Sequence, residues 1–140
     1  MSKFTPEEIE YLQNQRLGRL ATVDKQGDPH VVPVGFRYNP ETDSIDIGGY
    51  NMAASKKYRD AVRHGRAAFV VDDVAPPWKP RMLEVRGSVE GVVEGAEKIN
   101  QNQSAEILRI TPTHIISFGL TSDMVPGEEG KMEFSSRKVG

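Results

Sequence analysis

Residues 82–93 read MLEVRGSVEGVV, a long stretch in which apolar and polar side chains alternate. A period of two predicts a β-strand with one face turned to a core. Gly87 interrupts the pattern, and a glycine inside a strand marks a bulge or a sharp bend. A long bent strand is typical of closed or nearly closed barrels, so this stretch favours a barrel.

The rest of the chain supplies further strands with short turns between them. Five more segments have strand composition: residues 17–23, 30–38, 44–49, 67–71 and 114–120. The first three are joined by turns rich in Gly, Pro, Asn and Asp, which predicts an antiparallel meander. Pro33 lies inside the second segment and offers no N–H to a sheet ladder. We therefore expect an edge, a bulge or a special backbone approach at Pro33.

Helix signals separate these strands. Three helices are predicted, over residues 6–15, 52–63 and, with a more polar sequence, 96–110. Thr5 and Glu8 have the spacing of a capping box at the start of the first helix. Gly65 suits the end of the second helix, and Pro112 is expected to close the third. Six strands with two or three peripheral helices predict an α+β fold.

Length and composition limit the remaining possibilities. A chain of 140 residues fits one domain, residues 1–140, in which 121–140 is expected to be a flexible or covering tail. There is no cysteine, which excludes disulfides, zinc–thiolate sites, iron–sulfur clusters and a thiol nucleophile. We see neither a secretory signal nor a run of about 18 apolar residues, so a cytoplasmic protein without a membrane partner is expected.

The strongest local signal is a run of basic residues after Ser55. It contains Lys56, Lys57, Arg59 and Arg63, and three of these share one face of the predicted helix. Ser55 would lie at the N-terminal end of that helix, where free N–H groups and the helix dipole favour an anion. The run is either a phosphate or polycarboxylate site or a solvated basic face. Arg37, at the end of the second strand, would converge on the same anion.

Other chemistry is sparse. Trp78 lies in the Pro-rich segment 74–80, where it would wall a ring-binding pocket, anchor a subunit interface or pack within its loop. No histidine has a metal or general-base motif, no metal site is expected, and Asp72–Asp73 suggests a strand-ending turn. A net charge of -2 argues against a nucleic-acid partner. This inventory suits either a protein whose bound cofactor carries the chemistry or a pure binder.

Five segments in a fixed order carry a family resemblance. They are RLGRLATV (16–23), PHVVPVGFR (29–37), SKKYRD (55–60), PW (77–78) followed by Arg81, and EVRGSVE (84–90). The set resembles the split-barrel superfamily of the pyridoxamine phosphate oxidases, and most of all the branch that uses the deazaflavin coenzyme F420. The resemblance implies a six-stranded antiparallel split barrel and a homodimer with the cofactor at the subunit interface.

The resemblance also implies a set of cofactor-binding residues: Val32, Pro33, Val34, Arg37, Ser55, Lys56, Lys57, Arg59, Trp78 and Arg81. The strand through Pro33 would run along the ring system. Arg37 and the Ser-Lys-Lys segment would hold the phosphate. The other helix cations would meet the tail, because F420 carries several glutamate carboxylates besides its phosphate. Trp78 and Arg81 would approach the cofactor or the interface, from the same subunit or from its partner.

The sequence departs from the FMN-dependent oxidases at two places. Met82 stands about where those enzymes have a flavin-contacting glutamine, and their C-terminal pyridoxamine-phosphate segment has no counterpart. The resemblance therefore favours an F420-dependent oxidoreductase that passes a hydride to a conjugated enone or quinone. An FMN-dependent oxidoreductase of the same fold, or a non-catalytic binder of deazaflavin, flavin or haem, remains an alternative. Tyr50 and Tyr58 are the proton-donor candidates nearest the expected site, and solvent is an alternative donor.

Overall fold

The computed structural model describes residues 1–99, 104–120 and 134–140. Its elements are α1 (Pro6–Gln13), β1 (Leu17–Val23), β2 (Pro29–Asn39), β3 (Ser44–Gly48), η1 (Met52–Ala54), α2 (Lys56–His64), β4 (Arg66–Ala75), β5 (Lys79–Val92), η2 (Ala96–Lys98), β6 (Ile107–Phe118) and β7 (Ser135–Lys138). Both η elements are short 3₁₀ turns. In the part of the chain that the structure describes, no helix has the length and apolar character needed to cross a membrane.

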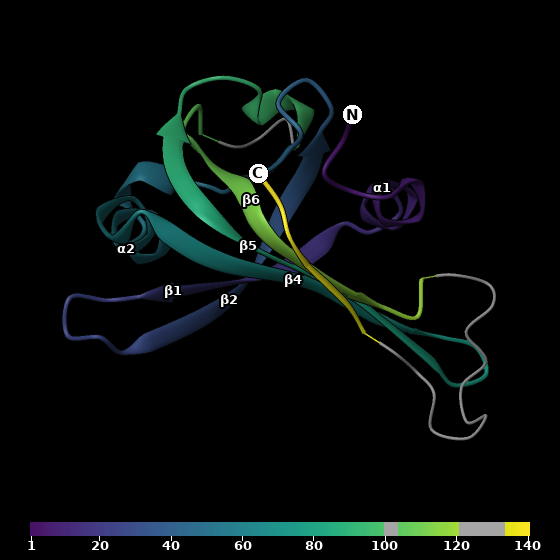
Figure 1. Ribbon diagram of the computed structural model, residues 1–140. Coiled ribbons are helices and arrows are strands. Elements are labelled where there is room, and N and C mark those ends of the chain that lie inside the picture. The colour runs from purple at the N-terminus through teal and green to yellow at the C-terminus, as the bar shows by residue number, and fades with distance from the viewer. Residues whose placement is uncertain (100–103, 121–133) are drawn as a thin grey trace.

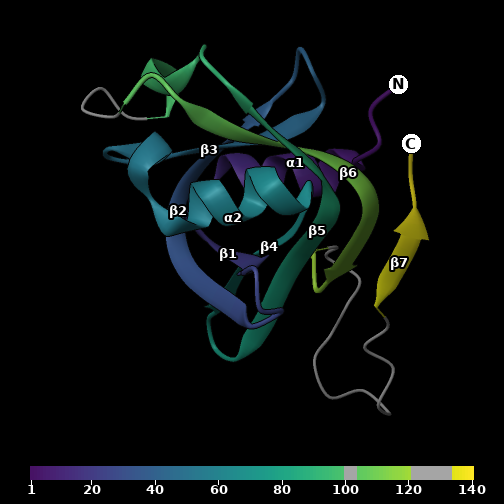
Figure 2. The same cartoon turned by 90° about the vertical axis from the view of Figure 1, so that its left-hand side faces the viewer.

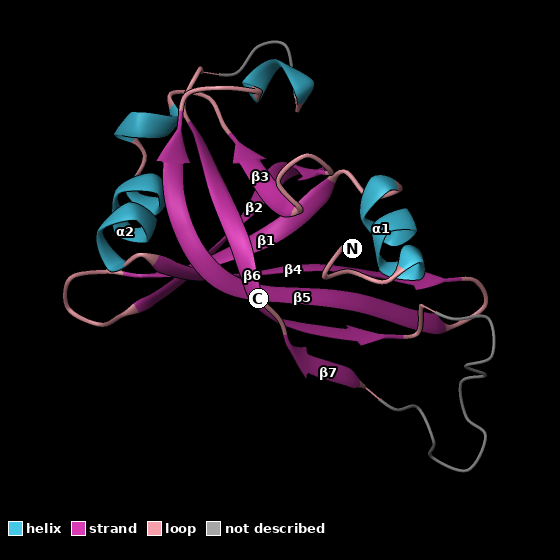
Figure 3. Cartoon of the chain, turned by 45° about the horizontal axis from the view of Figure 1, so that its top comes forward, coloured by secondary structure: helices cyan, strands magenta, loops and turns pink. Residues whose placement is uncertain are grey.

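The strands form one antiparallel sheet that closes on itself (Figure 1). Their order is β3-β2-β1-β4-β5-β6-β7, and a further pairing of β3 with β6 joins the two sides of a six-stranded barrel. The strand β7 lies outside that closure and pairs with the second half of β6. The helices α1 and α2 lie on opposite sides of the barrel (Figure 3). The predicted α+β barrel of six antiparallel strands is confirmed.

Alternate side chains point inward along the strands and fill the barrel. The buried set includes Leu20, Val34, Phe36, Ile47, Phe69, Val71, Leu83, Val85 and Ile115. Phe36 and Phe69 meet edge to face with ring centroids 4.9 Å apart, a favourable aromatic geometry. The period of two read from the sequence therefore corresponds to the inner and outer faces of the barrel.

Gly87 is where the long strand bends, as predicted. The register between β5 and β6 shifts between Arg86 and Gly87. A side chain at Gly87 would overlap the carbonyl oxygen of Thr111, so only glycine fits against β6 here. Gly87 pairs with Pro112, which lies within β6 and not at the end of a helix. The bulge accommodates a proline that lacks a ladder N–H.

The third predicted helix, over 96–110, is wrong. In the described residues of that range the only helical element is the turn η2, and β6 already begins at Ile107. Ile107, Leu108 and Ile110 are fully buried, and this part of β6 pairs with β3 on one side and β5 on the other. A strand covered on both faces loses its alternation, so its sequence does not distinguish it from a buried helix.

The predicted loop over 74–80 is also shorter than expected. Only residues 76–78 connect β4 and β5, which continue as a two-stranded arm beyond the barrel (Figure 1). Asp72 and Asp73 therefore lie within β4 and do not form a turn. Arg81 on β5 donates from Nε to Asp73 at 2.9 Å, and the Tyr11 hydroxyl donates to the same carboxylate at 2.8 Å. The Arg81 bond links the two strands of the arm, and the Tyr11 bond joins α1 to β4.

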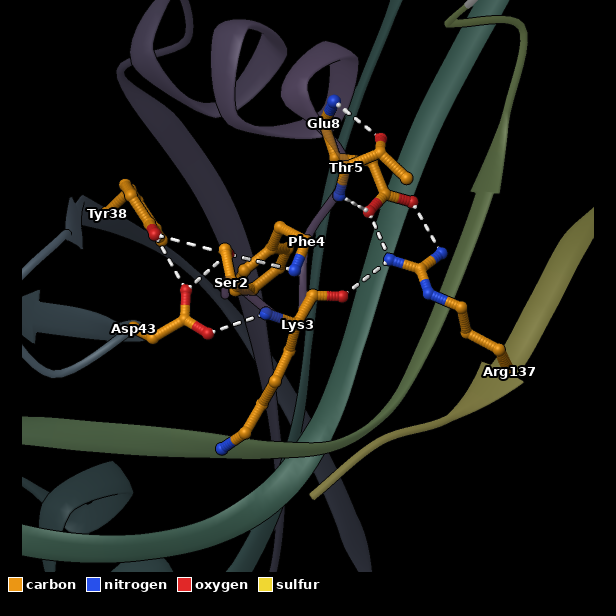
Figure 4. A network of polar contacts seen from close by, with 8 residues as sticks. All are labelled: Ser2, Lys3, Phe4, Thr5, Glu8, Tyr38, Asp43 and Arg137. Carbon is orange, nitrogen blue, oxygen red and sulfur yellow. Dashed lines mark hydrogen bonds and ion pairs between the residues drawn. The ribbon is translucent and has the colours of Figure 1, made fainter.

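The C-terminal strand is fixed to the first helix by a polar network (Figure 4). Thr5 and Glu8 form the predicted capping box. Glu8 is 1% exposed, and Arg137 of β7 donates from Nη1 to its carboxylate at 3.0 Å and from Nη2 to the Lys3 carbonyl at 2.8 Å. Burial raises the pKa of Glu8, but hydrogen bonds from Arg137 and Thr5 outweigh burial and hold the pKa below its usual range. The strand β7 begins at Ser135, within the C-terminal segment 121–140, of which residues 121–133 lie outside the described residues.

Candidate functional site

The candidate site lies where the second strand, β2, changes from having one strand neighbour to having two. The strand β2 pairs with β1 from Pro29 to Gly35, but with β3 only from Gly35 to Asn39. On the β3 side, residues 29–34 therefore have no strand partner within the described residues. A sheet edge presents unpaired main-chain N–H and C=O groups, which are hydrogen-bond partners for the polar edge of a planar ring.

Two of the three ring-contact residues predicted on β2 face the core. Val34 is buried in the barrel and Val32 is partly buried against the core cluster, whereas Pro33 is exposed between them. Alternation along the strand allows Val34 only main-chain contact with a ligand outside the barrel. Pro33 is the member of this group whose side chain is available there.

Where the pairing of β2 with β3 ends, the chain passes from β3 into α2 through a turn that side-chain hydrogen bonds hold in place. The Ser104 hydroxyl donates to the Gly49 carbonyl at 3.1 Å and accepts the Met52 N–H at 2.9 Å. Ser55 is the N-cap of α2, accepts the Tyr58 N–H at 3.3 Å and donates to the Met52 carbonyl at 2.6 Å. The positive end of the helix dipole is thus held close to the end of β3, which favours an anion there. Figure 2 views α2 side-on with the strands behind it.

The basic run of α2 divides into two kinds of cation. Lys56 and Arg63 flank the buried Asp60 carboxylate, with Nζ at 3.2 Å and Nη1 at 2.9 Å. Burial raises the pKa of Asp60, but these two cations outweigh burial and lower the pKa. Arg63 also donates to the Val23 carbonyl at 3.1 Å. These two residues fasten α2 to the end of β1, a role that the sequence did not reveal.

Lys57 and Arg59 form the second group of cations on α2, those that do not pair with Asp60. Within the described residues, no carboxylate lies at ion-pair distance from either side chain. A Cβ built on Gly49 would stand 3.7 Å from Lys57 Nζ, so the ammonium lies against a residue without a side chain. Lys57 is half-buried and Arg59 is exposed. Of the predicted phosphate ligands, Lys57 thus has the geometry of an available charge beside the β2 edge.

The tyrosines near this region differ in accessibility. Tyr50 is exposed on the turn after Gly49. Tyr58 packs on β5, where a side chain at Gly91 would overlap its phenol ring. Tyr50 is therefore the more accessible of the two proton-donor candidates.

Asp24, in the turn after β1, also contacts a residue of α2 and so helps to hold the helix against the barrel. It lies 3.0 Å from His30 Nε2 and 3.9 Å from Lys56 Nζ. The hydrogen bond from His30, supported by main-chain donors of the turn, lowers the pKa of Asp24 to about 2. This carboxylate gives Lys56 a second structural partner.

Arg37 opens onto a pocket at one end of the barrel. The pocket has a volume of about 220 Å³, and its lining includes Arg37, Asn39, Glu41, Glu94, Lys98 and Arg109. Arg109 donates from Nε to Asp46 at 2.8 Å and from Nη2 at 3.2 Å. Sequence analysis missed Arg109 because it placed the residue in a helix. The β-branched residues Ile107, Ile110 and Thr111 around it were the available signal for a strand.

Trp78 and Arg81 lie on the arm, on the other side of the barrel from α2 (Figure 1). Trp78 is 71% exposed at the tip. Arg81 is bound to Asp73, and its guanidinium carbon lies 5.1 Å from the centre of the Tyr11 ring. Within a single chain, Trp78 and Arg81 are therefore far from Lys57 and Ser55.

The outer face of β1, β2 and β4 carries a shallow apolar groove. Its volume is about 250 Å³, and its lining includes Arg19, Ala21, Val31, Ala68, Val70 and Glu84. Ala21 stands opposite both Val31 and Ala68 in the sheet, so two small side chains form a depression. Val31 is 67% exposed beside it. A surface of this kind suits an interaction with another apolar surface.

A family model described as pyridoxamine 5'-phosphate oxidase matches residues 4–118. The chain belongs to this family. A 5a,11a-dehydrotetracycline/5a,11a-dehydrooxytetracycline reductase of Streptomyces rimosus is 38% identical over 126 residues, which is 89% of each chain. The family and this relative make the chain a member of an oxidoreductase group, and the resemblance to the pyridoxamine phosphate oxidase superfamily read from the sequence is confirmed.

Solved structures support the same fold. A conserved hypothetical protein of Mycobacterium tuberculosis superposes with a TM-score of 0.68 at 19% identity, over 92% of this chain and 94% of that one. An FAD-binding protein of Mycobacterium smegmatis superposes with a TM-score of 0.61 at 20% identity, over 81% and 93%. Both proteins have the same barrel architecture as the present chain.

Proposed function

We propose that the protein is an F420-dependent reductase that transfers a hydride to a conjugated acceptor. The observation that carries the proposal is Lys57, a half-buried ammonium without a carboxylate partner in the described chain, beside Gly49 and the unpaired edge of β2. An anionic ligand with a polar ring matches both features. When bound, the reduced deazaflavin supplies the hydride.

The residues present fit the phosphate of such a cofactor. Lys57 would bind it together with N–H groups of the first turn of α2, and Ser55 holds that turn in place. Arg59, exposed on the same helix, adds positive charge for a carboxylated tail. Lys56 contributes less to binding, because Asp60 already holds its ammonium.

The β2 edge would orient the ring. Main-chain groups between Pro29 and Val34 are rigid because β1 pairs with their other side. A ring fixed at this edge presents one face to the acceptor, and that positioning is the principal contribution expected from the protein. Pro33 would exclude water from the ring at its exposed side.

The acceptor class is inferred from the relative in Streptomyces rimosus. Its name describes reduction of a dehydro compound, in which the 5a,11a locants denote a carbon–carbon double bond. We extend this chemistry to the present protein and propose a conjugated enone or quinone-type substrate. The hydride adds to one carbon of the double bond, and a proton from solvent completes the reduction.

A homodimer is part of the proposal. The apolar groove around Ala21 and Ala68, with exposed Val31 beside it, would be covered by a second copy. Trp78 on the projecting arm would then reach the partner's cofactor site, which its own chain does not allow. Light scattering tests this arrangement: Val31→Glu is expected to shift the mass from dimer to monomer, and a monomeric parent protein would contradict it.

The first experiment is a fluorescence titration of the purified protein with F420 and, separately, with FMN. Tight F420 binding with weak FMN binding is expected, and the reverse order would assign the protein to flavin chemistry. Lys57→Ala should weaken F420 binding by about 1–3 kcal/mol. Lys25→Ala, on the β1–β2 turn, is the matched control and should leave the affinity unchanged. Equal affinities of both variants and the parent would overturn the role of Lys57.

A further inference from the structure

Ser104 supplies a side-chain hydroxyl to a turn that lies far away in the sequence. Its Oγ donates to the Gly49 carbonyl at 3.1 Å and accepts the Met52 N–H at 2.9 Å. The Ser104 N–H donates to the same Gly49 carbonyl at 3.2 Å. A serine hydroxyl has one donor position and accepts through its lone pairs, so one side chain serves both groups. Ser104 therefore joins the two ends of the four-residue turn 49–52.

The hydroxyl occupies the place of the turn's own hydrogen bond. In an ordinary β-turn, the carbonyl of the first residue accepts the N–H of the fourth residue directly. In this turn those two groups, on Gly49 and Met52, both bond to Ser104 Oγ. An atom inserted between them holds the turn wider than a direct bond would. The shape of the turn thus depends on a residue outside it.

The turn is linked to α2 through Met52. Met52 is fully buried, and while its N–H bonds to Ser104, its carbonyl accepts the Ser55 hydroxyl at 2.6 Å. Ser55 also accepts the Tyr58 N–H, in the first turn of α2, at 3.3 Å. Two serines therefore fix one residue by both of its main-chain groups. A change at Ser104 would reach the N-terminal end of the helix by this route.

The same turn lies beside the Lys57 ammonium. A Cβ built on Gly49 would stand 3.7 Å from Lys57 Nζ and 3.2 Å from Met52 Sδ. The space around Gly49 is thus narrow, and a small movement of its main chain would change the surroundings of the ammonium. Because Ser104 holds the Gly49 carbonyl by two hydrogen bonds, it fixes the position of Gly49 relative to Lys57.

Ser104 is itself supported by the barrel. Ile47 of β3 pairs with Leu108 of β6, and both side chains are fully buried. From this pair the chain reaches Gly49 two residues later on one strand and Ser104 four residues earlier on the other. The Ser104 bonds therefore continue the contact between β3 and β6 beyond the end of their ladder. A binding site gains affinity when such a support holds it in the bound geometry beforehand.

We propose that Ser104 is a positioning residue of the anion site at Lys57, which it shapes by holding the turn 49–52 open. The proposal rests on the anion site of the proposed function, and Ser104 acts without touching the ligand. Without the hydroxyl, the Met52 N–H loses its acceptor, and the turn is free to close on a direct bond to Gly49. An anion of the phosphate class would bind the closed form less tightly, because reopening the turn costs free energy.

The experiment measures F420 binding by fluorescence for the parent, Ser104→Ala, Lys57→Ala and the double variant. Ser104→Ala should weaken binding about fivefold, the equivalent of one hydrogen bond. In the Lys57→Ala background the same substitution should change the affinity by less than about twofold, because Ser104 acts through the site at Lys57. Ser135→Ala, exposed on β7, is the matched control and should bind as the parent does. Urea unfolding of each variant separates lost affinity from lost stability.

A second measurement needs no variant. Coupling between two sites is reciprocal, so an anion that favours the open turn must also stabilise it. Saturating F420 should therefore slow hydrogen exchange of the Met52 amide in the parent about fivefold, whereas the Lys25 amide, in the β1–β2 turn, should exchange as before. Unchanged exchange at Met52 would overturn the proposal. Equal losses of affinity from Ser104→Ala in the two backgrounds would do the same.

The outcomes separate this proposal from the proposed function. If F420 binds the parent and Ser104→Ala equally, the F420 assignment stands and the positioning role is overturned. If F420 does not bind the parent, the F420 assignment fails, and inorganic phosphate becomes the probe, followed through the amide chemical shifts of α2. Weaker phosphate binding by Ser104→Ala than by the parent then supports the positioning role. No phosphate binding, or equal affinity of the two proteins, would overturn it.

Discussion

Two arginine–carboxylate pairs in this protein have the same chemistry and different surroundings. Arg137 and Arg109 each donate two hydrogen bonds to a carboxylate that is almost fully buried, Glu8 in one case and Asp46 in the other. The Nη2 atom of Arg137 also donates to the Lys3 carbonyl, so both terminal nitrogens of Arg137 have protein acceptors (Figure 4). Arg109 instead turns Nη1 toward a pocket, where Glu94 is its exposed partner.

The different surroundings of the two pairs distinguish a role in stability from a role in ligand binding. A buried ion pair contributes little net stability but is costly to break, since the remaining charge has no solvent. Both pairs should therefore matter for folding. The Arg109 pair is the one that lines a pocket, whereas both terminal nitrogens of Arg137 bond to Glu8 and, through Nη2, to main chain. The predictions below test this contrast.

The largest effect is expected from Arg109→Met. The substitution leaves Asp46 fully buried with only the Asn39 amide as a partner, and such a loss costs about 3–5 kcal/mol of folding free energy. Urea unfolding measures it. Adding Asp46→Asn to Arg109→Met should recover part of the loss, because the isolated charge is then gone. A single variant as stable as the parent would show that water reaches Asp46.

A smaller loss is expected from Arg137→Met, about 1–3 kcal/mol at neutral pH. The Arg137 side chain is 29% exposed, and Glu8 keeps its bond from the Thr5 N–H at 2.9 Å. The same unfolding assay measures the change. Lys138→Met, one residue later and exposed, is the matched control and should stay within experimental error of the parent. Equal losses in both variants would contradict a specific role for the Glu8 pair.

The Arg137 effect should depend on pH in a defined direction. Because the folded protein holds the pKa of Glu8 below its ordinary value of 4.5, the pair stabilises the fold above that pH and loses its contribution as the pH falls. Once Glu8 is protonated in the folded and unfolded states, Arg137 has no charge to pair with. The stability gap between parent and Arg137→Met should therefore narrow below about pH 4.5. A constant gap from pH 7 to pH 3 would assign the effect to lost packing.

These pairs also show what the sequence reveals and what it conceals. The capping box of Thr5 and Glu8 was predictable, because its partners are three residues apart and its geometry is local. The partner of Glu8 in the folded protein is 129 residues away, and no pattern in the sequence connects the two. Strand alternation predicted the strands of the barrel, and the glycine inside the longest of them predicted the bend at Gly87.

The candidate site was predictable in composition but not in detail. The sequence predicted a basic helix over 52–63, and the structure has a 3₁₀ turn at Met52–Ala54 followed by the basic helix α2, which Ser55 caps. It does not distinguish Lys56 from Lys57, because adjacent lysines differ only in the side of the helix they occupy. Folding brings Asp60 to one of them and Gly49 to the other. Tertiary contacts, and not the sequence pattern, therefore determine that Lys57 is the lysine available to a ligand.

The smallest effect on stability should come from Glu94→Gln, which changes the exposed partner of Arg109. Its carboxylate is 72% exposed and 3.4 Å from Arg109, so its removal should change the unfolding free energy by less than about 0.5 kcal/mol. The comparison with Arg109→Met is decisive, because both substitutions remove one side of the same contact. If Glu94→Gln proved as costly as Arg109→Met, the outward nitrogen of Arg109 would be committed to the fold. The pocket would then be as closed to ligands as the Arg137 pair.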